Sequence, residues 1–148
     1  MSRFSGDDYE GDYGAYALWR QAVKNALTGR KGQAVLRELE AALVALPARR
    51  LIGGVLARDG EVCALGALAQ HRLGSVPTAE YFGCGLEELT AGDVSGWAHD
   101  ELGLTHALAT EVQWENDEGA YWRQESPEER FDRVLRWVQA HLVTTVAS

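Results

Sequence analysis

Cysteine is scarce in this 148-residue chain, and apolar runs of membrane-spanning length are absent from it. It contains only two cysteines, Cys63 and Cys84, and they are not spaced as a CxxC motif. Two cysteines alone cannot supply the four ligands of a structural zinc site. No apolar stretch approaches the 18 or more residues that a membrane-spanning helix requires. The sequence therefore predicts free thiols and no membrane partner.

Motifs of common enzyme classes are also missing. The sequence has no GxSxG nucleophile elbow, no Walker A loop and no HExxH zinc motif. The spacing of a calcium loop counted from Asp117 fails, because Trp122 stands where the turn glycine is required. These absences favour a protein with no metal and no cofactor, and they favour binding over catalysis.

Basic residues are fewer than acidic ones, with 14 Lys and Arg against 22 Asp and Glu and a net charge of −8. Residues 14–78 hold nine basic and four acidic side chains, whereas residues 79–133 hold three and fourteen. An acidic chain repels a polyanion, so the sequence predicts no nucleic-acid partner. The basic segment could still bind one small phosphorylated molecule, and the acidic segment could dock a basic protein.

Length and composition are those of one globular domain, since 46% of the residues are apolar and 24% are charged. The first twelve residues carry four acidic side chains where a secretory signal would have a basic and then an apolar region. We therefore expect a flexible acidic arm over 1–12, a single helical domain over 13–148 and a cytoplasmic location.

The spacing of apolar residues predicts a mostly α fold. The strongest signal is the last helix, because Ser126, Pro127 and Glu129 supply an N-cap, a proline at the first helical position and a capping box. We expect one compact domain of five to six helices with at most a short strand pair. The predicted helices cover 15–28, 33–46, 61–73, 92–102, 105–115 and the stretch after Ser126.

Two segments between these helices are less regular. The apolar run 51–56 contains two glycines and is interpreted as a weak strand, with a buried irregular segment as the alternative. Asp59 and Gly60 predict a turn, although Asp59 could equally be the N-cap of a helix that begins near Glu61. Residues 74–90 show no clear pattern.

The most unusual local composition lies between residues 114 and 122. Amides and carboxylates beside aromatic rings can both orient and stack a planar ligand. The alternative is structural, with the tryptophans in the core and with Asn116 and Asp117 closing a helix end. The candidate ligand-binding side chains of this segment are Trp114, Asn116, Asp117, Glu118, Tyr121 and Trp122.

Three further residues complete the candidate site. Arg49 and Arg50 are the basic counterpart of the acidic segment, and they could either pair with it or bind a phosphate. Cys63 lies near a predicted helix start, where the helix dipole could lower its pKa and make it a nucleophile. The alternative for Cys63 is a small buried thiol.

Five short motifs stand out along the chain, namely KGQA with LRE from Lys31, RLI from Arg50, GEVCALGA from Gly60, NDE from Asn116, and PEERF with WV from Pro127. They resemble a family of small uncharacterised proteins from phages and prophages, over residues 28–142. Phe131 departs from that pattern, in which a second tryptophan is expected, and so does the insertion at 77–85. The resemblance implies a mobile-element context and carries no activity.

From these features we expect a phage-type, non-catalytic binding protein that engages a host protein or sequesters a small signalling molecule such as a nucleotide derivative. Inhibition of a host defence is one such role. The alternatives are a small hydrolase or transferase with Asp117 or Glu118 as general base, and a virion accessory or assembly protein. The sequence does not set the oligomeric state.

Overall fold

The computed structural model describes residues 13–121 and 123–143. Over these residues the chain is 67% helical, which confirms the predicted fold class. The acidic arm and Trp122 lie outside the described residues. The α-helices of the described part are α1 (Tyr13–Thr28), α2 (Arg30–Val44), α3 (Ala64–Leu73), α4 (Ala79–Phe82), α5 (Ala91–Leu102), α6 (His106–Glu118) and α7 (Pro127–His141), with a 3-10 turn η2 (Leu86–Glu88).

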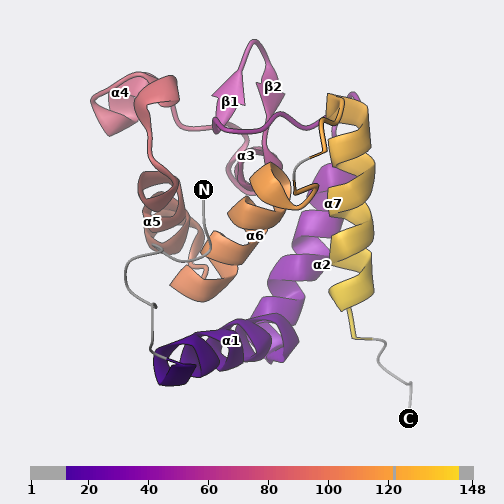
Figure 1. Ribbon diagram of the computed structural model, residues 1–148. Coiled ribbons are helices and arrows are strands. Elements are labelled where there is room, and N and C mark those ends of the chain that lie inside the picture. The colour runs from indigo at the N-terminus through magenta and orange to yellow at the C-terminus, as the bar shows by residue number, and fades with distance from the viewer. Residues whose placement is uncertain (1–12, 122, 144–148) are drawn as a thin grey trace.

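Two helices, α2 and α6, organise the packing of the others. α2 contacts α1, α3 and α7, and α6 contacts α1, α3, α5 and α7. Figure 1 shows α7 alongside α2, with α1 lying across the ends of α2 and α6. This arrangement brings α1, α6 and α7 around one common space.

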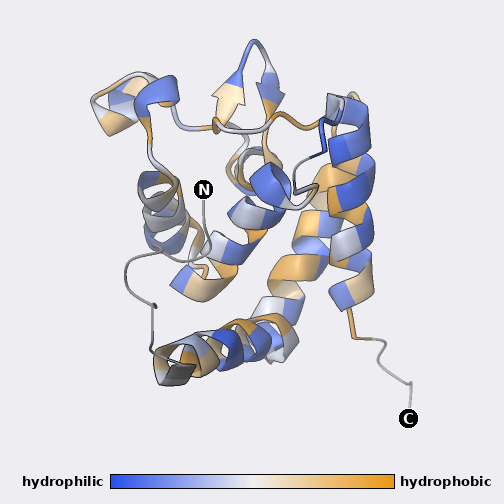
Figure 2. Cartoon of the chain, in the orientation of Figure 1, coloured by the Kyte–Doolittle hydropathy of each residue, from blue (hydrophilic) through white to orange (hydrophobic). Residues whose placement is uncertain are grey.

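The core is built by apolar stripes that face one another. Leu36, Leu39 and Leu43 of α2 are fully buried, and Phe131 and Val134 of α7 are buried opposite. Spacings of three and four residues place each set on one face of its helix. The outer face of α7 is hydrophilic in Figure 2, as the amphipathic pattern predicts. The predicted helix over 33–46 is confirmed with other bounds, since α2 begins at Arg30 and ends at Val44.

α3 differs from the other helices because its first six residues, 64–69, are buried on every side. Every residue from 62 to 69 is buried. Gly66 permits this close packing, since a Cβ atom there would lie 2.7 Å from the carbonyl oxygen of Leu56. The predicted start near Glu61 is wrong, because the helix begins at Ala64 with Cys63 as its N-cap.

The residues before α3 form a short hairpin in place of a helical turn. Strands β1 (Ala57–Arg58) and β2 (Glu61–Val62) pair antiparallel. Asp59 and Gly60 connect them with φ angles of 53° and 81°, the positive values that a two-residue hairpin turn requires. The predicted turn is confirmed, and the N-cap alternative for Asp59 is wrong.

The weak strand predicted over 51–56 is also wrong, because this run has no regular structure; Leu51, Ile52 and Leu56 are buried and Gly54 is exposed. Its backbone bonds reach distant partners: Leu51 N–H donates to the oxygen of Pro127 at 3.1 Å, and Ile52 N–H donates to that of Val62 at 3.0 Å. Gly54, with φ of 79°, interrupts any strand.

The stretch 74–90 folds into α4 and η2, separated by Gly83 in the left-handed conformation. α4 is the one α-helix of the described residues that was not predicted. Its single turn is too short to show a periodic pattern of apolar residues. Among the described residues, no helix combines the length and the hydropathy needed to cross a bilayer.

The close crossing of α1 and α2 predicts that Gly32 tolerates no side chain. A Cβ atom at Gly32 would lie 1.5 Å from the backbone oxygen of Ala26, so the helices would have to separate. Gly32→Ala should lower the free energy of unfolding by about 1–3 kcal/mol, measured by urea unfolding. The control is Gly96→Ala in α5, where a Cβ meets nothing within 4 Å and stability should rise by about 0.5–1 kcal/mol. Equal stability of the two variants would contradict the crossing.

Candidate functional site

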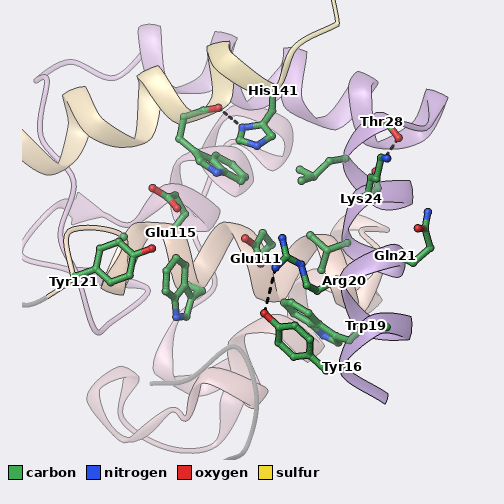
Figure 3. A pocket seen from close by; sticks show the side chains of 16 residues that line it. Tyr16, Trp19, Arg20, Gln21, Lys24, Thr28, Glu111, Glu115, Tyr121 and His141 are labelled. Atoms are coloured by element: carbon green, nitrogen blue, oxygen red, sulfur yellow. Dashed lines mark hydrogen bonds between the residues drawn. The ribbon is translucent and has the colours of Figure 1, made fainter. Parts of the chain in front are cut away.

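A pocket of about 850 Å³ lies between α1, α6 and α7, and we call it the α1/α6/α7 groove. Small-molecule sites in proteins have volumes of about 300–1,000 Å³. Figure 3 shows side chains from the three helices around the pocket. Its aromatic lining consists of Tyr16, Trp19, Trp114, Tyr121 and Trp137, and its charged and polar lining includes Arg20, Lys24, Glu111, Glu115 and His141.

α1 provides one wall because of its spacing. Val23 and Leu27 are buried and anchor the helix, and Trp19, one turn before Val23, is half-buried. Arg20 lies beside Tyr16, donating to its hydroxyl at 3.3 Å with the guanidinium 5.7 Å from the ring centre. The wall therefore combines an apolar base with an exposed cationic edge.

α6 provides the opposite wall through Glu111, Trp114 and Glu115, which share one face at spacings of three and four. The two carboxylates are deeply placed, with Glu111 4% exposed and Glu115 9% exposed. The Trp114 ring meets the Tyr121 ring edge to face, with centroids 5.8 Å apart. Since Tyr121 is 75% exposed, the aromatic lining continues from the interior to the surface.

An ion-pair network fixes α6 against α7. Arg133 contacts Glu115 Oε1 at 3.0 Å and Glu125 Oε1 at 2.6 Å, and all three side chains are nearly buried. Burial alone would lower the pKa of Arg133, but the hydrogen bond and charge of Glu125, together with Glu115, outweigh burial and raise it. The Glu115 carboxylate is thus held by a guanidinium that stays charged.

α7 closes the groove with Trp137 and His141. The His141 ring lies against the Trp137 ring, with centroids 4.9 Å apart, and its Nδ1 is 2.8 Å from the Trp137 carbonyl oxygen. Both side chains are half-buried. Indole and imidazole therefore form a single packed surface on this side.

Asn116 and Asp117 were predicted as ligand contacts or as structural residues, and the structure shows structural contacts for both. Asn116 is 1% exposed; its Oδ1 accepts from Ala64 N–H at 3.0 Å and its Nδ2 donates to the oxygen of Ile52 at 3.0 Å. Asp117 Oδ1 accepts from Gly54 N–H at 3.1 Å. Both belong to the last turn of α6, which continues through Glu118 and not, as predicted, to residue 115.

Arg49 and Arg50 lie away from the groove. Arg50 forms ion pairs with Glu61, at 2.6 Å, and with Glu128. Arg49 lies 3.5 Å from Asp132 Oδ1, and its guanidinium is 4.7 Å from the centre of the Phe131 ring. The predicted pairing of these arginines with the 114–122 segment is wrong, because they connect the hairpin region to α7.

Cys63 is the buried thiol of the alternative interpretation. Its Sγ caps α3 by accepting from Gly66 N–H at 3.4 Å. Burial raises its pKa to about 12, so the expectation of a lowered pKa is wrong. A neutral thiol at physiological pH is a poor nucleophile.

The groove thus unites only two of the predicted residues, Trp114 and Tyr121. Glu118 is half-buried and is not part of the lining, and Trp122 lies outside the described residues. The residues of α1 and α7 that line the groove were not among the predicted site residues. A usable signal was the placement of three tryptophans, Trp19, Trp114 and Trp137, beside charged residues at the margins of apolar stripes.

Comparison with protein-family models, with curated proteins and with solved structures found no match. Within 13–121 and 123–143, no group of three or more His, Cys, Asp and Glu side chains is placed to hold a metal ion.

The buried contacts of Asn116 predict a large loss of stability on truncation. Asn116→Ala leaves the N–H of Ala64 and the carbonyl of Ile52 without their partner. Each unsatisfied buried group should lower the free energy of unfolding by about 1–3 kcal/mol. Chemical denaturation measures the loss. The control Asp117→Asn keeps an oxygen for Gly54 N–H and should change stability much less. A loss below that of the control would show that the Asn116 bonds do not hold the fold.

The raised pKa of Cys63 predicts a pH-dependent stability. Above the ordinary thiol pKa of 9.0 the unfolded chain loses this proton, while the folded chain keeps it until about pH 12. The free energy of unfolding should therefore fall with pH in this window, by up to about 1.4 kcal/mol per pH unit from this group. Cys63→Ser, which keeps the cap, should have a shallower decline in urea titrations from pH 8 to 11. Parallel declines would exclude a buried, protonated Cys63.

Proposed function

We propose that this protein is a non-catalytic binding protein whose α1/α6/α7 groove takes up a small planar ligand. The observation that carries the proposal is the lining of the groove, which combines five aromatic side chains with charges of both signs. Aromatic walls stack planar molecules, and a few fixed polar groups orient them.

The other candidate groups support binding over catalysis. Cys63 is buried with a raised pKa, and Asp117 is committed to the hydrogen bonds of Gly54 and Asn116. Neither lines the groove. Sequestration of a signalling molecule in a phage-infected cell remains the biological setting that we propose. The alternatives stay predictions: engagement of a host protein, a small hydrolase or transferase, and a virion accessory or assembly protein. The contacts of the described residues favour none of them.

Two alanines of α1 provide a matched test of the groove. Ala17 and Ala22 are both exposed, but only Ala17 lines the pocket. Ala17→Phe should fill the groove and abolish small-molecule binding, whereas Ala22→Phe should leave it unchanged. Native mass spectrometry of the purified protein and thermal shifts with a metabolite panel measure this. Binding that survives Ala17→Phe, or a complete lack of small-molecule binding by the unmodified protein, would overturn the proposal.

A further inference from the structure

We propose that a second pocket, between α5, α6 and the 51–56 run, binds a small neutral molecule that carries a primary amide on a planar ring. The pocket has a volume of about 250 Å³, and we call it the α5/α6 pocket. It shares no lining residue with the α1/α6/α7 groove, so this inference goes beyond the proposed function. Its volume lies just below the range of about 300–1,000 Å³ for sites of drug-sized ligands, which favours a ligand of one ring.

The side-chain amide of Gln113 carries the inference. Gln113 lines the α5/α6 pocket from α6 and is only 9% exposed. Within 13–121 and 123–143, no hydrogen bond joins this amide to another group. The amide is not completely enclosed by protein, so the pocket is the space in which it can find partners. Since the large majority of buried polar side chains are hydrogen-bonded, a molecule in the pocket would supply the missing partners.

Asp117 presents a second polar group to the same pocket. It lies four residues after Gln113, and residues at this spacing share one face of a helix. Its Oδ1 accepts from Gly54 N–H at 3.1 Å and from Asn116 Nδ2 at 2.8 Å, whereas its Oδ2 has no such bond among the described residues. An ionised carboxylate is an acceptor only, so this oxygen requires a donor from the ligand.

The lining of the α5/α6 pocket excludes charged ligands. Among the described residues, no Lys or Arg lines the pocket, so an anion would face Asp117 without a cation to balance it. An organic ammonium has donors and no acceptor, and it would leave the N–H groups of Gln113 unpaired. A neutral group with both donors and an acceptor satisfies both side chains.

A primary amide has this pattern of donors and acceptor. Its carbonyl oxygen would accept from Nε2 of Gln113, one of its N–H groups would donate to Oε1 of Gln113, and the other would donate to Asp117. A hydroxyl group has one donor and cannot serve both acceptors. Leu56, Leu89 and Val94 give the pocket apolar walls, against which a planar ring can be buried.

Titration with four one-ring compounds, followed by NMR, tests this recognition. Benzamide carries the primary amide, whereas benzoate carries an anion, benzylamine an ammonium, and acetophenone a carbonyl without N–H groups. Benzamide should bind at least tenfold more tightly than each of the others, because it alone satisfies both side chains. Compounds of this size bind weakly, so its Kd should be roughly 1 mM. Benzamide that does not bind, or that binds no more tightly than acetophenone, would overturn the proposal and leave the pocket to water.

Gln113→Leu tests where benzamide binds. It should weaken benzamide binding at least tenfold without lowering the melting temperature, because an apolar side chain replaces an unpaired buried amide. The control Gln139→Leu changes an exposed glutamine of α7 outside the pocket and should leave benzamide binding unchanged. Benzamide binding that survives Gln113→Leu would contradict the assignment. If Gln113→Leu does not fold, the response of the Gln113 side-chain NH₂ resonances to benzamide in the unmodified protein decides: a shift supports the assignment, and no shift overturns it.

Asp117→Asn tests the second contact. The asparagine keeps an oxygen for Gly54 N–H and places an NH₂ group at the position of Oδ2. A donor would then face the donor of the amide, so the preference for benzamide over benzoate and acetophenone should fall roughly tenfold. An unchanged preference would show that Asp117 takes no part in recognition.

The two sites are distinguished by their variants. Ala17 lines the groove and not the α5/α6 pocket, so Ala17→Phe should bind benzamide as tightly as the unmodified protein. A groove ligand should be lost in Ala17→Phe and retained in Gln113→Leu, and the test of the groove is therefore read in the Gln113→Leu background. Loss of benzamide binding in Ala17→Phe would overturn the assignment to the α5/α6 pocket and leave the proposed function standing.

Discussion

The buried side-chain amide of Asn116 links segments that are far apart in the sequence. It accepts from the N–H of Ala64 at the start of α3 and donates to the carbonyl of Ile52. The backbone carbonyl of Asn116 accepts from the side chains of Arg130 and Arg133 of α7. Since buried polar groups must be paired, the positions of α3, α6 and α7 are set together by this one residue. The relative positions of α6 and α7 in the α1/α6/α7 groove therefore depend on the contacts of Asn116.

The walls of the groove are held by different forces. Nearly buried ion pairs between Arg133, Glu115 and Glu125 join α6 to α7, and their geometry is directional. α1 is held by the apolar contacts of Val23 and Leu27 and by the close crossing at Gly32. The α6 and α7 walls are therefore held together by ion pairs, and the α1 wall is held by apolar packing. Truncation of a buried apolar side chain should accordingly loosen the packing of α1 more than the contact between α6 and α7.

Local signals explain what could be predicted from the sequence. The cap formed by Ser126, Pro127 and Glu129 depends only on neighbours along the chain, and it was confirmed. Within 51–62 only the turn at Asp59 and Gly60 could be predicted, because the backbone bonds of the remaining residues go to Pro127 and across a hairpin. The first six residues of α3, 64–69, are all apolar and buried, so no single stripe marks the start of this helix. In the candidate site, Trp114 and Tyr121 were predicted from the unusual local composition of residues 114–122. Trp19 was not predicted, because its role in the groove depends on the tertiary packing that places α6 opposite α1.

The clustering of Trp19, Trp114 and Trp137 has an optical consequence. The chain has five tryptophans, and these three share the groove lining while Trp97 is buried in the core. Intrinsic fluorescence of the native protein should therefore report mainly on the polarity and occupancy of one location. A ligand that stacks on these indole rings would quench their fluorescence directly, so binding can be followed without an added dye.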